Sequence, residues 1–238
     1  MTVDPLVLLP ELDRATDRLL RTVADLDDAA VTGPSLLPGW TRGHVLTHLA
    51  RNADGYVNLL TAARTGEDIP QYASPEARDA DIAAGGGRPA AAQLADLRSS
   101  AEQFAELARS MPVQAWAAKV RASRGPRVAA TLIWGRLREV EVHHVDLAAG
   151  YSTADWPDAF SQRVLHEVLK DLAGRDGSPA LVLRPTETEQ PLALGPADAA
   201  PTVTGPAHAL AGWLTGRSAG DDLVVTPSGP LPAPPAWL

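Results

Sequence analysis

The segment Arg138–Leu147 constrains this chain most, because it places a carboxylate and an imidazole on one face of a helix. Glu139 and His143 are four residues apart, and residues at that spacing lie one above the other on an α-helix. The surrounding pattern predicts a helix from about residue 128 to Gly150. A carboxylate and an imidazole at this spacing can bind one metal ion, or they can form a hydrogen-bonded pair in a helix interface.

The apolar residues of this segment predict which side of the helix faces the core. Glu139 and His143 share their side with Leu132, Val140, Val142 and Leu147. An unpaired charge on an inward face would be costly, so the pair needs a partner. The opposite side carries Arg138, Glu141 and His144, and we expect it to be exposed to solvent.

Three more helical patterns precede this one, at about residues 4–30, 41–65 and 89–111. Asp4 followed by Pro5 predicts the start of the first, and Thr41 is expected to cap the second. Residues 66–87 have the composition of a loop with a short helical turn at 75–83, and residues 112–126 that of an irregular connection. Four helices predict a bundle, whose core is a common location for inward-facing metal ligands.

The second helical pattern contains His44 and His48, again four residues apart. His48 lies at the centre of the apolar side, and Asn52 lies one turn further on. An inward histidine is usually a core residue, but a Glu–His pair on another inward face makes His48 a candidate ligand. Two histidines and one carboxylate suit a catalytic zinc site with one open position, or a non-haem Fe(II) site with more. Asn52 and Asp146 are candidates to support the ligands.

The pattern changes near residue 150, where short apolar runs bounded by Gly and Pro replace the long helical periodicity. After a helix at 158–174 we expect strands at 180–184, 191–194, 202–204 and 223–225, with a short helix at 207–215. The fold class we predict is therefore α plus α+β. A four-helix bundle at 1–149 would be followed by a small α+β domain at 150–238.

Composition excludes several classes of protein. The chain has no cysteine, which rules out disulfides and thiolate zinc sites and fits a reducing cytoplasm. Its net charge of −8, with scattered basic residues, argues against a nucleic-acid partner. No apolar run is long enough to span a membrane, and the N-terminus lacks a signal-peptide pattern, so we expect no membrane association. The oligomeric state stays open.

Three segments resemble the mycothiol-dependent maleylpyruvate isomerase family, which combines a DinB-like metal-binding four-helix bundle with a sterol-carrier-like C-terminal domain. They are residues 39–49, residues 133–147 and residues 205–217, and they occur in the family's order. The resemblance implies that His48, Glu139 and His143 bind zinc. It also implies that Arg217 is a catalytic residue in the active cleft. Arg217 and Asn52 are the candidate residues for binding the thiol cofactor, mycothiol.

The resemblance implies a reaction as well. The mycothiol thiolate would add to the cis double bond of maleylpyruvate, the resulting single bond would rotate, and elimination would give fumarylpyruvate. Arg217 would bind a substrate carboxylate, although a cation at a helix C-terminus is also favourable for stability alone. Two alternatives stay open: an S-transferase that joins a small thiol to another electrophile, and a metal-stabilised regulatory module without catalysis.

Overall fold

The computed structural model describes residues 5–237, which form a mostly helical chain with two small sheets. The chain divides after Gly150 into two compact units. None of the described helices is long and apolar enough to cross a membrane. The predicted fold class, helical followed by α+β, is confirmed.

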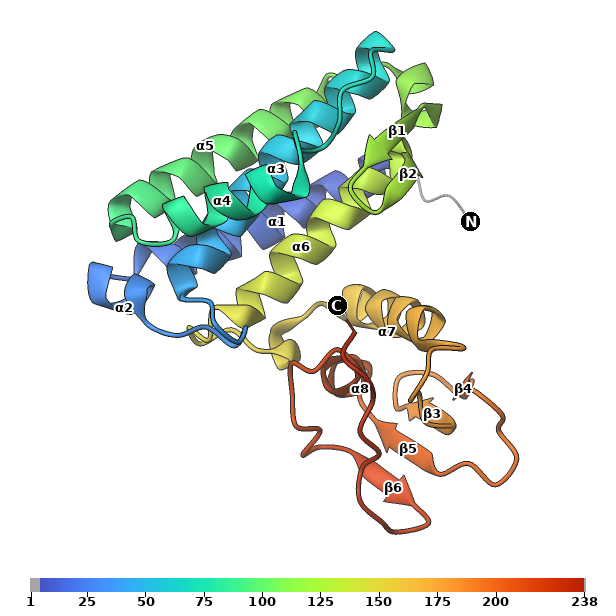
Figure 1. The fold of residues 1–238 in the computed structure, drawn as a ribbon. Helices are drawn as coiled ribbons and strands as arrows, with labels where there is room; N and C mark the ends of the chain where they lie inside the picture. The colour runs from blue at the N-terminus through green and yellow to red at the C-terminus, as the bar shows by residue number, and fades with distance from the viewer. Residues whose placement is uncertain (1–4, 238) are drawn as a thin grey trace. The chain divides into compact units, whose positions relative to one another are not determined.

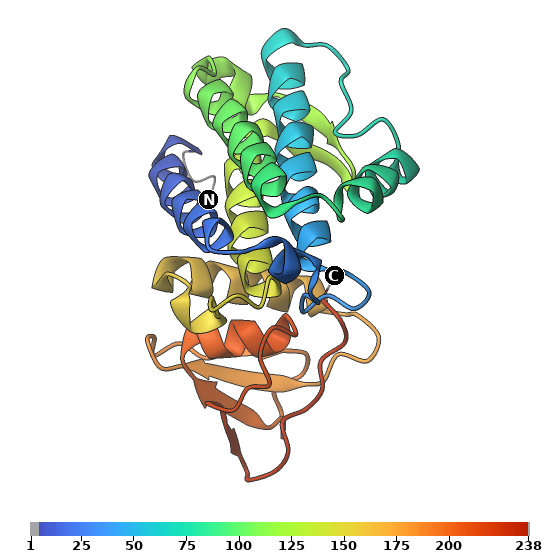
Figure 2. The ribbon, with the colours of Figure 1, turned by 90° about the vertical axis from the view of Figure 1, so that its left-hand side faces the viewer.

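Four long helices build the first unit as a bundle (Figure 1, Figure 2). They are α1 (Pro5–Ala24), α3 (Arg42–Thr65), α5 (Ala90–Arg109) and α6 (Leu132–Asp146). Helix α3 packs against α5 and α6, and α1 packs against the same two helices, so the four surround one core. The start of the first helix was predicted at Asp4, which lies outside the described residues.

The second helix has the predicted limits because both of its ends are capped. The Thr41 side chain accepts a hydrogen bond from the His44 backbone N–H, and Gly66 ends the helix in a left-handed conformation. A glycine on the facing helix allows close packing: a Cβ at Gly135 would lie 2.5 Å from the Tyr56 hydroxyl oxygen. The side chain of Tyr56 therefore rests directly on the backbone of α6.

The predicted limits of the helices on either side of α3 need correction. Helix α1 ends at Ala24, and a separate short helix, α2 (Asp28–Thr32), begins after Asp27, whose carboxylate accepts from the Ala30 N–H at 2.7 Å. Asp27 favours this cap over helix continuation because its short side chain satisfies a free N–H group. Ser74 likewise caps α4 (Pro75–Gly85), which is longer than the turn expected there.

The connection before α6 is more regular than predicted. It contains a 3₁₀ turn, η1 (Val113–Ala117), and an antiparallel hairpin of β1 (Lys119–Ala122) and β2 (Gly125–Val128). Gly125 has φ of 106°, which permits the tight turn. A second 3₁₀ turn, η2 (Ala129–Thr131), follows, so α6 starts four residues later and ends four residues earlier than expected.

The second unit contains two helices and a four-stranded sheet. After η3 (Thr153–Asp155) come α7 (Asp158–Leu172), β3 (Leu181–Pro185), β4 (Leu192–Leu194), β5 (Thr202–Gly205), α8 (Ala207–Leu214) and β6 (Val224–Thr226). The strand order is β4-β3-β5-β6, with only β3 and β5 parallel among these described strands. Leu181, Leu183 and Val203 are fully buried, and α7 packs against α8.

Candidate metal centre

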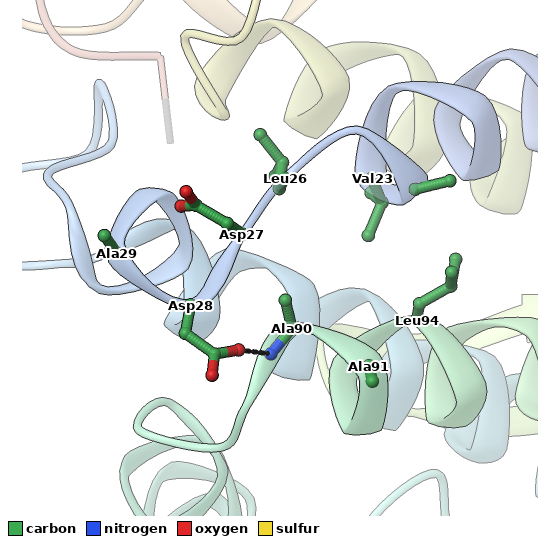
Figure 3. Close-up of a pocket in the computed structure, with 9 residues that line it drawn as sticks. Val23, Leu26, Asp27, Asp28, Ala29, Ala90, Ala91 and Leu94 are labelled. Carbon is green, nitrogen blue, oxygen red and sulfur yellow. Dashed lines mark hydrogen bonds between the residues drawn. The ribbon is translucent and has the colours of Figure 1, made fainter.

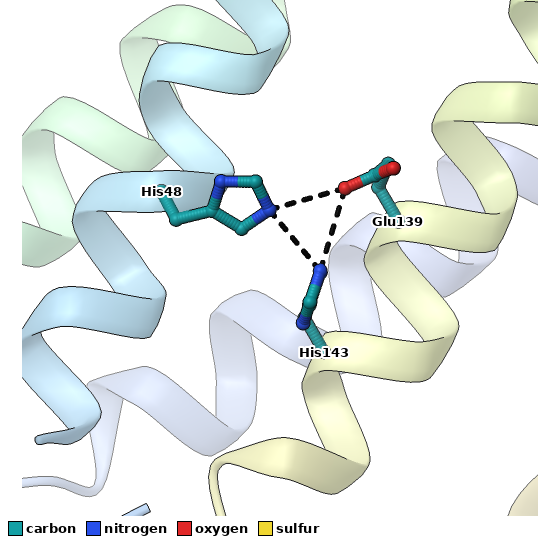
Figure 4. Close-up of side chains that lie close together, drawn as sticks. All are labelled: His48, Glu139 and His143. Carbon is teal, nitrogen blue, oxygen red and sulfur yellow. Dashed lines mark hydrogen bonds and ion pairs between the residues drawn. The ribbon is translucent and has the colours of Figure 1, made fainter. Parts of the chain in front are cut away.

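Three side chains from two helices converge inside the bundle (Figure 4). Nε2 of His48, on α3, lies 3.1 Å from Oε2 of Glu139 and 3.1 Å from Nε2 of His143, both on α6. The last two atoms are 3.4 Å apart. The structure thus brings together the residues that the sequence places ninety positions apart.

The spacing of these three atoms fits a metal ion. Zinc bonds to histidine and carboxylate are about 2.0–2.2 Å long, so tetrahedral ligand atoms lie roughly 3.3 Å from one another. The three measured separations of 3.1, 3.1 and 3.4 Å are close to that value. His48 is 7% exposed, whereas Glu139 and His143 are 20% and 16% exposed, so the cluster has a solvent-facing side for a fourth ligand.

Burial and mutual contacts shift the three groups in different directions. Burial lowers the pKa of His48 to about 4, despite its hydrogen bond to Glu139. Burial alone would raise the pKa of Glu139, but hydrogen bonds to both histidines outweigh it and hold that pKa well below the ordinary value. A neutral imidazole and an ionised carboxylate are the forms in which these groups bind metal.

Asp146 supports His143 from the buried side of α6. Its Oδ2 lies 2.8 Å from Nδ1 of His143, and its side chain is 1% exposed. Burial favours the neutral ring, but the hydrogen bonds to Asp146 and Glu139 outweigh it and raise the pKa of His143. A carboxylate on Nδ1 fixes the proton there and directs the Nε2 lone pair at the cluster, as in many metal sites.

Asn52 is buried and its carbonyl is already engaged. Its Oδ1 accepts from Nη1 of Arg136 at 2.8 Å, and the same nitrogen donates to the Leu49 carbonyl. Arg136 is 1% exposed. Asn52 therefore links α3 to α6 one turn from His48.

His44 does not join the cluster. Its Nδ1 accepts from the Thr41 N–H at 3.2 Å and completes the cap of α3. The ring of Trp40 packs near both histidines, with centroid distances of 6.3 Å to His44 and 5.7 Å to His48.

The prediction of a solvated opposite face on α6 was wrong for two of its three residues. Glu141 and His144 are each 1% exposed. Glu141 accepts from Arg18 of α1 at 2.5 Å, and Nε2 of His144 lies 2.8 Å from the Thr22 hydroxyl. Because α1 covers this side of α6, the helix is packed on both faces. The periodicity of the α6 sequence alone did not predict its contact with α1.

Arg217 lies in the second unit, directly after α8. Its backbone N–H donates to the Gly212 carbonyl at 2.8 Å, and its Nη1 donates to the Thr215 carbonyl at 2.6 Å. The positive charge thus sits at the C-terminus of a helix, where the helix dipole favours it.

Sequence reasoning missed Arg78 beside the cluster. It lies on α4, and its Nη2 is 3.1 Å from Nδ1 of His48. Its guanidinium carbon is 5.9 Å from the centroid of the Tyr72 ring. The only sequence signal was Ser74 before Pro75, which predicts the start of a helix in a segment otherwise rich in loop-forming residues.

Two surface hollows of the bundle are lined by other residues. One, of about 590 Å³, lies between the end of α1, α2 and the start of α5. There Asp28 accepts from the Ala90 N–H at 2.7 Å and caps α5 (Figure 3). The other, of about 520 Å³, runs between α1 and α5 and reaches Arg136. Neither hollow is lined by His48, Glu139 or His143, so these two hollows are separate from the candidate metal centre.

Comparisons with known proteins agree with this fold. The mycothiol maleylpyruvate isomerase N-terminal domain matches residues 12–148, and the MDMPI C-terminal domain matches residues 155–236. A crystal structure of a mycothiol-dependent maleylpyruvate isomerase is 29% identical with a TM-score of 0.91, covering 99% of this chain and 98% of that chain. A histidine-to-alanine mutant of such an isomerase matches with 28% identity and the same score and coverage. No curated protein matches the sequence. The chain belongs to the mycothiol-dependent maleylpyruvate isomerase family.

Proposed function

We propose that this protein is a zinc- and mycothiol-dependent isomerase that converts maleylpyruvate to fumarylpyruvate. The observation that carries the proposal is the convergence of His48, Glu139 and His143 at zinc-like spacing, in a chain of this family. Both similar solved structures bear the name of this isomerase.

In this proposal His48, Glu139 and His143 hold the metal through three ligand atoms. A zinc ion held there would lower the pKa of the mycothiol thiol. Since the chain has no cysteine, the reactive thiol has to come from outside. The reaction changes a cis double bond to a trans one and returns the thiol unchanged.

The chain's own side chains would orient the partners. Asp146 holds the His143 ring by its Nδ1 and so keeps Nε2 directed at the cluster. Arg217, in a C-terminal domain that we place at residues 150–238, would bind a substrate carboxylate through its guanidinium. Asn52, held in place by its hydrogen bond from Arg136, would line the side of the site that binds the thiol.

The role of Arg217 is tested by its replacement. Loss of one charge-assisted contact is worth roughly 1.5–3 kcal/mol, so Arg217→Ala should lower kcat/KM about tenfold to a hundredfold. Zinc content should stay at the wild-type level, because Arg217 is not a ligand in this proposal. An unchanged kcat/KM would remove Arg217 from the active site.

A small-thiol S-transferase is the second candidate, because the same metal site would activate a thiol for conjugation. The decisive experiment incubates the zinc-loaded protein with mycothiol and maleylpyruvate and follows both by NMR. We expect fumarylpyruvate to accumulate while the mycothiol signals stay constant. Consumption of mycothiol in proportion to product would favour the S-transferase and contradict the isomerase.

A further inference from the structure

Arg78 contacts the cluster from a direction opposite to the metal-facing atoms. Its Nη2 lies 3.1 Å from Nδ1 of His48, while Nε2 of the same ring faces Glu139 and His143. A third helix thus reaches the ligand set, since Arg78 belongs to α4. The side chain is 28% exposed, and its Nη1 donates at 2.7 Å to Asp79, which is itself exposed.

The two ends of the His48 ring are chemically coupled. A guanidinium is only a donor, so Nδ1 has to accept the Arg78 hydrogen bond with its lone pair. The neutral ring then carries its proton on Nε2, where Glu139 Oε2 accepts it at 3.1 Å. A metal bound at Nε2 needs that lone pair, which moves the proton to Nδ1. Nδ1 and Arg78 would then be two donors facing each other.

The Arg78–His48 hydrogen bond and metal binding at Nε2 are therefore mutually exclusive. We propose that Arg78 is a metal-coupled binding residue: it hydrogen bonds to His48 Nδ1 until a metal is bound, and is then released to bind a substrate carboxylate. The inference rests on the proposed function, and it adds Arg78 to Arg217 as a second candidate cation for binding the substrate.

The surroundings of Arg78 suit such a release. One of its other partners, Asp79, is 67% exposed, so the ion pair between them is weak and constrains the guanidinium little. Tyr72 hydrogen bonds to Arg78, and its ring centroid lies 5.9 Å from the guanidinium carbon, so it can keep the planar group beside the cluster once Nδ1 of His48 no longer accepts from it. Because an arginine stays charged, a released Arg78 needs an anion or water, and a dicarboxylate such as maleylpyruvate supplies one.

The test compares Arg78→Met and Arg78→Lys with wild type. Arg64→Met, which removes an exposed arginine at the end of α3, is the control. Zinc affinity is measured by competition with a chromogenic chelator, and maleate binding to the zinc-loaded protein is measured by calorimetry. We expect Arg78→Met to bind zinc about threefold to tenfold more tightly, because a competing hydrogen bond is gone, and maleate about tenfold more weakly. Arg78→Lys should lose less maleate affinity, and Arg64→Met should match wild type in both.

An Arg78→Met zinc affinity that is unchanged or weaker, or an unchanged maleate affinity, would overturn the inference. Histidine ¹⁵N shifts of the metal-free protein give an independent check, since His48 should carry its proton on Nε2 in wild type and lose that preference in Arg78→Met. If wild type binds no zinc, both this inference and the proposed function fail. If the zinc and maleate shifts appear but mycothiol supports no isomerisation, only the proposed function fails.

Discussion

The two faces of α6 carry the same kinds of side chain, but the side chains of one face stay partly exposed and those of the other are buried. One face presents Glu139 and His143, which converge with His48 from α3 and keep 20% and 16% exposure. The other presents Glu141 and His144, which are 1% exposed.

The partners explain the difference between the faces. Glu141 accepts from an arginine on α1, so its charge is compensated within the bundle. Glu139 instead lies beside two histidines, whose ring nitrogens have lone pairs that can bind a metal. A Glu and a His on a buried helix therefore indicate a metal site only where several lone pairs converge near solvent, and they indicate structural pairing where a cation or hydroxyl already satisfies them.

The largest expected effect separates a ligand from a capping residue on α3. His48→Ala should abolish stoichiometric zinc, because it removes one of three ligands. His44→Ala should keep the metal and lose only part of the α3 cap, a cost of roughly 1 kcal/mol. Metal analysis of the two purified variants measures this, and full zinc retention in His48→Ala would sink the ligand assignment.

The next effect concerns the structural face. Glu141→Ala should lower the free energy of unfolding by about 2 kcal/mol, because Arg18 loses its carboxylate. The cost stays below that of a fully buried pair, since the Arg18 side chain is 30% exposed and can be hydrated. Zinc stoichiometry should be unchanged. Urea unfolding measures the free energy of unfolding. A Glu141→Ala variant that keeps wild-type stability but loses zinc would contradict this account, because it would place the metal ligand on the Glu141 face.

A smaller effect on zinc binding is expected from Asp146, the carboxylate partner of His143. Asp146→Asn removes the charged partner of His143 Nδ1 and should weaken zinc binding about tenfold to a hundredfold at alkaline pH. The raised pKa of His143 means that protons compete with metal above its usual value of 6.5, so zinc affinity falls as the pH drops through that raised pKa. In Asp146→Asn this fall should move to lower pH. Chelator competition over a pH series measures it, and curves that coincide would exclude a role for Asp146.

The helical faces show how far the sequence alone reached. Glu139, His143 and His48 were predicted on inward faces from four-residue spacing, because that spacing is a local property of a helix. The burial of Glu141 was not predictable this way, since it depends on α1, more than a hundred residues earlier in the chain. Arg78 was missed for a similar reason: its contact with His48 depends on how α4 packs against α3.

The second unit was predictable for a different reason. Its strands are short apolar runs bounded by Gly and Pro, and β3, β4, β5 and β6 each lie within one residue of the predicted limits.

In the first unit, the β1–β2 hairpin was missed because Pro126 and Arg127 break the apolar alternation that identifies a strand.

The most direct test of the account is an anomalous difference map, recorded at the zinc absorption edge from crystals of the zinc-loaded protein. The account predicts one peak per chain, about 2.0–2.2 Å from Nε2 of His48, Nε2 of His143 and a carboxylate oxygen of Glu139. A zinc peak beside Glu141 and His144, or no peak at the three predicted ligands, would contradict it.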